Sequence, residues 1–112
     1  MIGQVQVVVY HRSDDPAAVL TAYDESSARM HGTPGLLGNE LHRALGDPRG
    51  FAVVSRWASV RDFTGWEAGP GHKEQTAPLR PFRDHTRQRP FEVFQVTARY
   101  GAPLGPEPEV RT

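Results

Sequence analysis

The sequence predicts an α+β domain of the ferredoxin-like βαββαβ type, in which a four-stranded antiparallel sheet carries helices on one face. Two observations support this fold class. Segments with the periodicity of strands and helices follow one another in the order strand, helix, strand, strand, helix, strand. A chain of 112 residues also has room for one modest core, which the split βαβ layout builds with short connections. We therefore expect one domain over residues 1–100, followed by a proline- and glycine-rich tail over residues 101–112.

The first strand is expected over residues 3–11. Valines alternate on one face from Val5 to Val9, and β-branched residues dominate the segment. Gln6 and Tyr10 belong to the other face, whose mixture of amides and a phenol suits a pocket wall or a partly wet surface.

The first helix is expected to begin near Pro16 and to end near His31. Residues 12–15 supply a capping side chain just before the proline, which is tolerated best in a first helical turn. Glycines and a proline within residues 32–35 then end the helix. Its buried face is expected to carry Leu20, Tyr23, Ser27 and Met30.

The middle of the chain is expected to form an antiparallel hairpin followed by a helix. Strands over residues 36–45 and 51–57 flank a strong turn signal at residues 46–50. Ser59 is expected to cap the helix that follows, which glycine and proline at residues 69–71 stop. The period of this helix is set by Val60, Phe63 and Trp66.

The last third of the chain contains fewer regular elements. We expect a second short helix over residues 72–79, a polar loop over residues 83–90 and a final strand over residues 91–100.

Composition and charge exclude several classes of function. Thirteen basic residues balance thirteen acidic ones, so we expect no sequence-independent binding of nucleic acid, which needs a basic surface. The lack of cysteine excludes disulfides, thiolate nucleophiles and thiolate-bound cofactors. The sequence shows no signal-peptide pattern, and its longest apolar run, Val7–Tyr10, is too short for a membrane span. We therefore expect a cytoplasmic protein that does not bind membranes.

The histidines do not form a metal-binding pattern. No metal-ligand spacing relates them, and we find no binding motif for another cofactor, so none is expected. Four of them are expected at the surface: His11, His31, His42 and His85.

Residues 51–66, followed by His72, resemble the signature of the antibiotic biosynthesis monooxygenase family. In that family a strand ends in tryptophan, here Trp57, and a capping serine opens a helix that carries an aromatic residue and then tryptophan or histidine. The segment over residues 33–38 is similar to the Pro-Gly-hydrophobic entry into the second strand of the family. The resemblance covers about residues 3–100 and is moderately specific.

The resemblance implies a homodimer whose sheets face each other as a dimeric α+β barrel, with a pocket in each subunit between helices and sheet. One branch of the family oxidises an anthrone or phenol with O2 without metal or flavin, and another binds and degrades haem. The oxygenase branch tends to carry an asparagine where this chain has Val53, and the haem branch a histidine where it has Thr76. We expect a cofactor-independent monooxygenase acting on an aromatic polyketide-like phenol or anthrone in antibiotic biosynthesis. The alternatives are a polyketide cyclase or isomerase, a haem-degrading enzyme and a non-catalytic ligand-binding dimer.

Cofactor-free oxygenation requires an aromatic slot, a general base and donors for a developing oxyanion. His72 is the expected base, and the Trp57 indole, with Gln6 or Arg56 as alternatives, is the expected donor. Trp57 at a strand end is equally typical of a core residue, and His72 of a solvated helix N-terminus. The expected substrate-binding residues are Gln6, Tyr10, Val53, Ser55, Phe63, Trp66 and Arg80.

Four arginines within ten residues form the one strongly basic segment of the chain. Such a run is usually a solvated loop, but it would also serve as a rim that recruits an anionic aromatic acid. These residues are Arg80, Arg83, Arg87 and Arg89.

Overall fold

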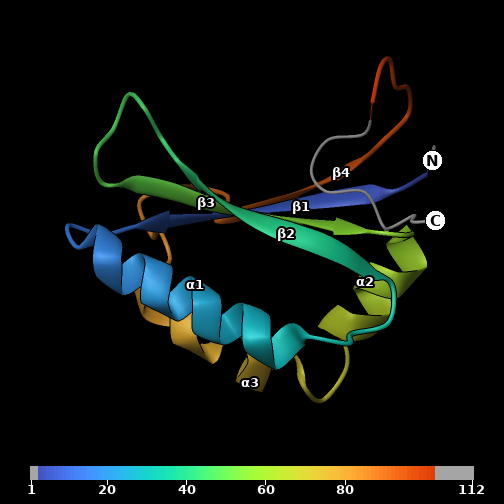
Figure 1. Cartoon of the computed structure of the whole chain (residues 1–112), viewed down its shortest axis with the longest axis horizontal. Helices are drawn as coiled ribbons and strands as arrows, with labels where there is room; N and C mark the ends of the chain where they lie inside the picture. Colours follow the sequence, from blue (N-terminus) through green and yellow to red (C-terminus); the bar gives the residue numbers. More distant parts are fainter. Residues whose placement is uncertain (1–2, 103–112) are drawn as a thin grey trace.

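The computed structural model describes residues 3–102 and confirms the ferredoxin-like α+β fold. Four strands form one antiparallel sheet in the order β2-β3-β1-β4, and the helices lie against one face of it (Figure 1). No helix among the described residues is long and apolar enough to cross a membrane. The elements are β1 (Val5–Arg12), α1 (Pro16–Met30), β2 (Leu36–Arg43), β3 (Gly50–Trp57), α2 (Val60–Glu67), α3 (His72–Thr76), a 3-10 helix (Ala77–Phe82) and β4 (Phe91–Gln95).

The register between β1 and β3 divides the sheet into an inner face, toward the helices, and an outer face. Val5 pairs with Trp57 and Val7 with Ser55, and these residues belong to the inner face. Val8 pairs with Val54 on the outer face, because successive side chains of a strand point to opposite sides. The outer face carries no helix in Figure 1.

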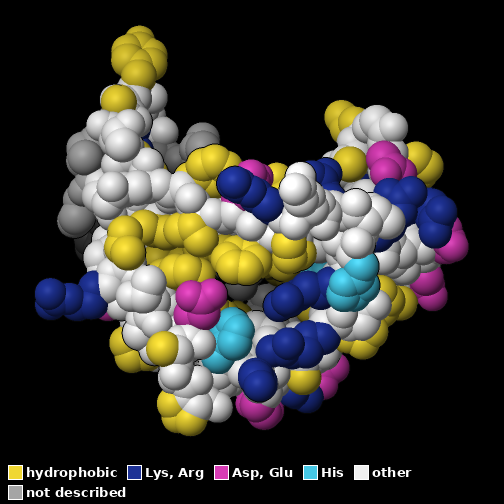
Figure 2. All heavy atoms as spheres, turned by 180° about the vertical axis from the view of Figure 1, so that it is seen from behind, with side chains coloured by type: hydrophobic (Ala, Val, Ile, Leu, Met, Phe, Trp, Pro, Cys, Tyr) yellow, Lys and Arg dark blue, Asp and Glu magenta, His cyan; other side chains and the backbone are white. Residues whose placement is uncertain are grey.

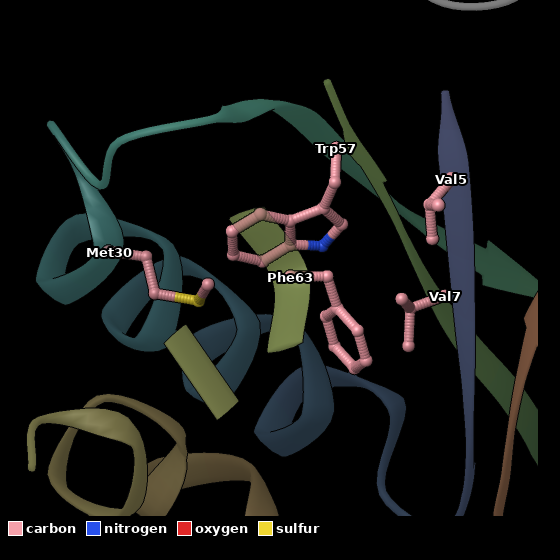
Figure 3. Packing of buried hydrophobic residues seen from close by; sticks show 5 residues of the cluster. All are labelled: Val5, Val7, Met30, Trp57 and Phe63. Atoms are coloured by element: carbon pink, nitrogen blue, oxygen red, sulfur yellow. The ribbon is translucent and has the colours of Figure 1, made fainter. Parts of the chain in front are cut away.

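The core lies between the inner face of the sheet and helices α1 and α2. Trp57 is fully buried, and the edge of its ring packs against Phe63 with centroids 5.7 Å apart. Figure 3 shows its indole between Met30 and the two valines of β1. The core cluster consists of Val5, Val7, Met30, Trp57 and Phe63.

Helix α1 begins as expected, but a different set of its residues is buried. The carboxylate of Asp15 accepts a hydrogen bond from the Ala18 amide at 3.2 Å, and proline occupies the first turn. Leu20 was expected in the core, yet it is 51% exposed. Met30 is buried as expected, while the other buried positions lie one residue earlier than expected, and Tyr23 and Ser27 line a cavity. The buried residues are Val19, Ala22, Ser26 and Met30.

The last strand is shorter than its sequence pattern predicts. Strand β4 ends at Gln95, which pairs with Val5, the first residue of β1. Beyond this pair, Gly3 and Gln4 each form a backbone hydrogen bond with Val96. Tyr100 pairs with no strand among residues 3–102 and is fully exposed. Of the expected tail, residues 103–112 lie outside the described part of the chain.

Strand β2 also ends early, at Arg43 instead of Leu45, because Ala44 already bonds to Gly50 across the turn. The segment after β3 follows the prediction: α2, then the short α3, which continues as a 3-10 helix to Phe82. The loop from residue 83 to residue 90 returns to β1, where the Asp84 amide donates to the Tyr10 carbonyl at 3.0 Å. His11 and Arg83 also form an isolated β-bridge.

Candidate functional site

A cavity lies between the inner face of the sheet and the helical layer. Its volume is about 130 Å³, counted as space for the centres of water-sized spheres, and it opens to solvent at its mouth. The lining residues Phe91 and Glu67 are exposed and mark the mouth, because the helices leave the β4 edge uncovered. Figure 2 shows this opening as a hollow beneath a band of apolar side chains, with basic, acidic and histidine side chains along its other rim.

One wall of the cavity is aromatic and is built by α2. Phe63 and Trp66 both line the space, with ring centroids 6.2 Å apart. Trp66 is anchored because its indole N–H donates to Gln75 Oε1 at 2.7 Å. Valines of the sheet, Val9 and Val53 among them, complete an apolar surface suited to a flat ring system.

Trp57 stands behind this wall and does not line the cavity. Its ring lies 5.1 Å from that of Trp66, and it has no exposed surface. Its indole N–H donates to the hydroxyl oxygen of Ser55 at 3.0 Å, and Ser55 does line the cavity. Trp57 thus combines the core position expected of a strand-ending tryptophan with one polar contact toward the site.

His72 opens α3 at the edge of the aromatic wall. Its imidazole meets Trp66 edge-on at 4.4 Å, and its Nδ1 atom is buried without a hydrogen-bond partner in the described part of the chain. Burial, followed by the positive charge of Arg80, holds the pKa of His72 below its usual value. The ring is therefore neutral near pH 7 and able to accept a proton.

His11 lines the same cavity from β1, although its sequence context led us to expect a surface residue. It is 2% exposed because it continues the inward alternation of Val5, Val7 and Val9. Burial and then the charge of Arg83 lower its pKa to about 4. Its Nδ1 atom has no hydrogen-bond partner among residues 3–102. The other three histidines expected at the surface are exposed: His31, His42 and His85.

Arg83 adds a cation to the cavity between the 3-10 helix and β1. Its bridge to His11 fixes the backbone, and its half-buried guanidinium lines the space. Burial and the charge of Arg80 lower its pKa, and no carboxylate in the described segment forms an ion pair with it. Arg80 itself bonds to Thr76 at 3.0 Å and does not line the cavity.

A polar cluster lies toward the β2 edge of the cavity. The Tyr23 hydroxyl donates to Asn39 Oδ1 at 2.5 Å, and the Ser27 hydroxyl lies 3.4 Å from the same atom. All three residues line the cavity, and Asn39 pairs across the sheet with Ser55. Sequence inspection did not identify this cluster.

The structure brings five of the nine expected site residues to the cavity and places four elsewhere. Gln6 and Tyr10 belong to the outer face of β1, because strand alternation turns even-numbered residues away from the helices. Tyr10 is instead engaged by Glu92, which accepts its hydroxyl at 2.9 Å, and by Arg87 over its ring. Trp57 and Arg80 lie near the cavity without lining it, and the five that line it are Val53, Ser55, Phe63, Trp66 and His72.

The lining residues that were not predicted as site residues include His11, Tyr23, Asn39 and Arg83. Extending the valine alternation of β1 by one step would have identified His11. Tyr23 was assigned to the core, and Arg83 to a basic run interpreted either as a solvated loop or as a rim for an anionic substrate. Within the described ranges no group of three histidine or acidic side chains is arranged to hold a metal ion.

The chain is related in sequence to a known protein family and to a protein of Streptomyces. The sequence profile of the antibiotic biosynthesis monooxygenase family matches residues 3–77. Protein SchA of Streptomyces halstedii is 31% identical over 94 residues, which cover 84% of this chain but only 25% of SchA. The chain thus spans about a quarter of that relative.

Solved structures share the fold. SnoaB, a cofactor-independent oxygenase from Streptomyces nogalater, superposes with a TM-score of 0.67 at 19% identity, covering 92% of this chain and 99% of SnoaB. A conserved protein from Methanosarcina mazei superposes with a TM-score of 0.64 at 12% identity, over 86% of this chain and 95% of that one.

Proposed function

Because the chain belongs to the antibiotic biosynthesis monooxygenase family, we propose that it is a cofactor-independent monooxygenase that oxidises an aromatic polyketide-like phenol or anthrone with O2. The observation that carries this proposal is a neutral His72 with an unpartnered Nδ1 at the edge of an aromatic cavity. The description of SnoaB as a cofactor-independent oxygenase supports the same reaction class.

The reaction needs a base, an apolar slot, donors for the anion that forms, and O2. Phe63 and Trp66 hold the flat substrate, and His72 removes a proton from its activated methylene or phenol. The resulting enolate gives electrons to O2, and the two combine as a peroxide on the former methylene carbon. Loss of water from this peroxide leaves a carbonyl group, so one oxygen atom enters the quinone and the other leaves with the two hydrogens of the methylene. Atoms and electrons balance without an external reductant, because the substrate supplies the electrons.

The cationic side of the cavity selects the charge of the substrate in this account. Arg83 is half-buried and has no acidic partner in the described chain, so a carboxylate or phenolate of the substrate would compensate its charge. Arg80 does not line the cavity, and its positive charge lowers the pKa of both His72 and Arg83. We propose Arg83 as the substrate contact in place of Arg80.

We also propose that two copies of the chain associate through the outer face of the sheet. Val8 and Val54 pair at its centre, and Phe94 on β4 is 51% exposed there. An uncovered sheet face with such side chains is typical of an interface. The pairing would bring the two sheets face to face.

A polyketide cyclase or isomerase would use the same base and slot to move protons without consuming O2. An oxygen electrode separates the two activities. With dithranol, a dihydroxyanthrone, as the probe, we expect O2 uptake in proportion to quinone formation, and no product under nitrogen. Conversion of the probe at the same rate without O2 would contradict the proposal and favour the isomerase.

A further inference from the structure

Asn39 reaches the cavity because of an irregularity in β2. Leu36 pairs with Trp57, but Gly38 pairs with Arg56, so Leu37 is an extra residue between these two pairs. A regular strand would place Asn39 opposite Val54, on the outer face. The bulge shifts the register by one residue, which moves Asn39 to the inner face opposite Ser55.

The acceptor side of the Asn39 amide is already occupied. Its Oδ1 atom receives the Tyr23 hydroxyl at 2.5 Å and lies 3.4 Å from the Ser27 hydroxyl, both on α1. No acceptor within residues 3–102 is bonded to its Nδ2 atom, whose two N–H groups remain available. The amide is therefore held by its oxygen while its donors are free to meet a ligand.

The Ser55 hydroxyl on β3 is likewise held by its oxygen, while its hydrogen remains available to a ligand. Its hydroxyl oxygen accepts the Trp57 indole N–H at 3.0 Å, and its own hydrogen has no acceptor in the described structure. Because Trp57 is fully buried, this acceptor role is fixed from behind the cavity wall. What Ser55 offers to the cavity is a donor.

We propose that Asn39 Nδ2 and the Ser55 hydroxyl form the oxyanion-binding pair of the site, with Tyr23 and Trp57 as their positioning residues. The pair lies on adjacent strands and is aimed into an apolar cavity, where a charge-assisted hydrogen bond is strong. The ligand group is a phenolate or enolate oxygen of an aromatic substrate. This inference rests on the proposed function, since it assigns the groups that stabilise the anion formed by deprotonation.

The test measures ionisation of a bound dye, so it does not depend on oxygenase turnover. Alizarin, a dihydroxyanthraquinone, changes colour when its phenol ionises, and its pKa can be read from absorbance with and without protein. Donors that bond to the phenolate lower its pKa, and we expect a decrease of roughly one to two units on binding to the wild-type protein. Asn39→Asp keeps the acceptor for Tyr23 but loses the N–H donors.

Three variants complete the design. Asn39→Asp is expected to abolish or reverse the pKa shift, and Asn39→Leu, which adds no charge, is expected to abolish most of it. Gln88→Glu is the matched control, because it makes the same amide-to-carboxylate change on an exposed loop. It is expected to retain the wild-type shift. Circular dichroism checks that each variant is folded.

The outcomes separate this inference from the proposed function. A wild-type shift that is lost in either folded Asn39 variant and kept in Gln88→Glu supports the oxyanion pair. Alizarin that binds without a pKa shift, or with a shift that survives both Asn39 variants, overturns the pair and leaves the oxygenase proposal intact. Failure of the wild-type protein to bind alizarin contradicts the aromatic slot itself, and the inference falls with it.

Discussion

The indole N–H of Trp57 donates to the hydroxyl oxygen of Ser55 at 3.0 Å, from a ring with no exposed surface to a residue that lines the cavity. This contact changes the role expected for the tryptophan. Trp57 does not line the cavity, so its hydrogen bond influences turnover through Ser55.

Two substitutions test this relationship. Trp57→Phe retains most of the buried ring and should cost about 1–2 kcal/mol of stability, with kcat reduced about tenfold because Ser55 loses its orientation. Ser55→Ala removes the donor itself and should reduce kcat about a hundredfold. Steady-state kinetics with dithranol, together with urea unfolding, measures both. A larger kcat loss in Trp57→Phe than in Ser55→Ala would show that the indole acts directly.

The lowered pKa of His72 predicts how kcat/KM falls at acid pH, in the acid limb of the pH profile. As a base it must be neutral, and burial holds its pKa below the ordinary 6.5. The value of kcat/KM should therefore fall only as the pH drops below 6.5 and stay level from there to pH 8. In His72→Gln this limb should disappear along with most of the activity, and the residual rate should rise toward alkaline pH as the substrate ionises unaided. An unchanged acid limb in His72→Gln would assign the base to another group.

His11 predicts a pH-dependent stability. Its folded-state pKa of about 4 is below the unfolded value of 6.5, so the unfolded chain binds the proton more tightly. The stabilisation is complete above pH 6.5 and is lost as the pH falls toward 4, by on the order of 3 kcal/mol for a shift of this size. Urea unfolding between these pH values measures the slope. His11→Gln should flatten it, and a slope equal to that of the wild type would show that His11 is not its source.

The outer face of the sheet predicts the oligomeric state. Analytical ultracentrifugation at micromolar concentration should show a dimer, and Val54→Asp should produce a monomer because it places a charge at the centre of this face. Leu20→Asp makes a similar apolar-to-charged change at an exposed position of α1, on the helical side of the sheet, and is the control that should remain dimeric. A monomeric wild-type protein would contradict the interface.

The fold could be read from the sequence because periodicity determines it locally. The valine alternation of β1, the Asp15 cap and the Ser59 cap each predict an element that the structure contains. The ends of β2 and β4 could not be read in this way, since a strand ends where its partner ends. Tyr100 continues the alternation of β4, but no strand in the described part of the chain pairs with it.

The cavity was less predictable, for two physical reasons. Which face of a strand meets the helices depends on packing. The prediction therefore assigned Gln6 and Tyr10 to the cavity, whereas they lie on the outer face. The bulge in β2 reverses the parity of Asn39, and the local signal for it is Gly38, because a glycine inside a strand often marks a bulge. The residues carried by the family signature, Phe63, Trp66 and His72, were found because they are close together in the chain.

The central claim, that the protein inserts an oxygen atom from O2 into an aromatic substrate with His72 as the base, is tested most directly by isotope labelling. Dithranol is incubated with the protein under heavy-isotope O2 in ordinary water, and the quinone is analysed by mass spectrometry with brief sampling to limit exchange. We predict one labelled oxygen atom per quinone, formed far faster than in the protein-free control and in His72→Gln. Unlabelled product, or labelled product formed no faster than without the protein, would contradict the account.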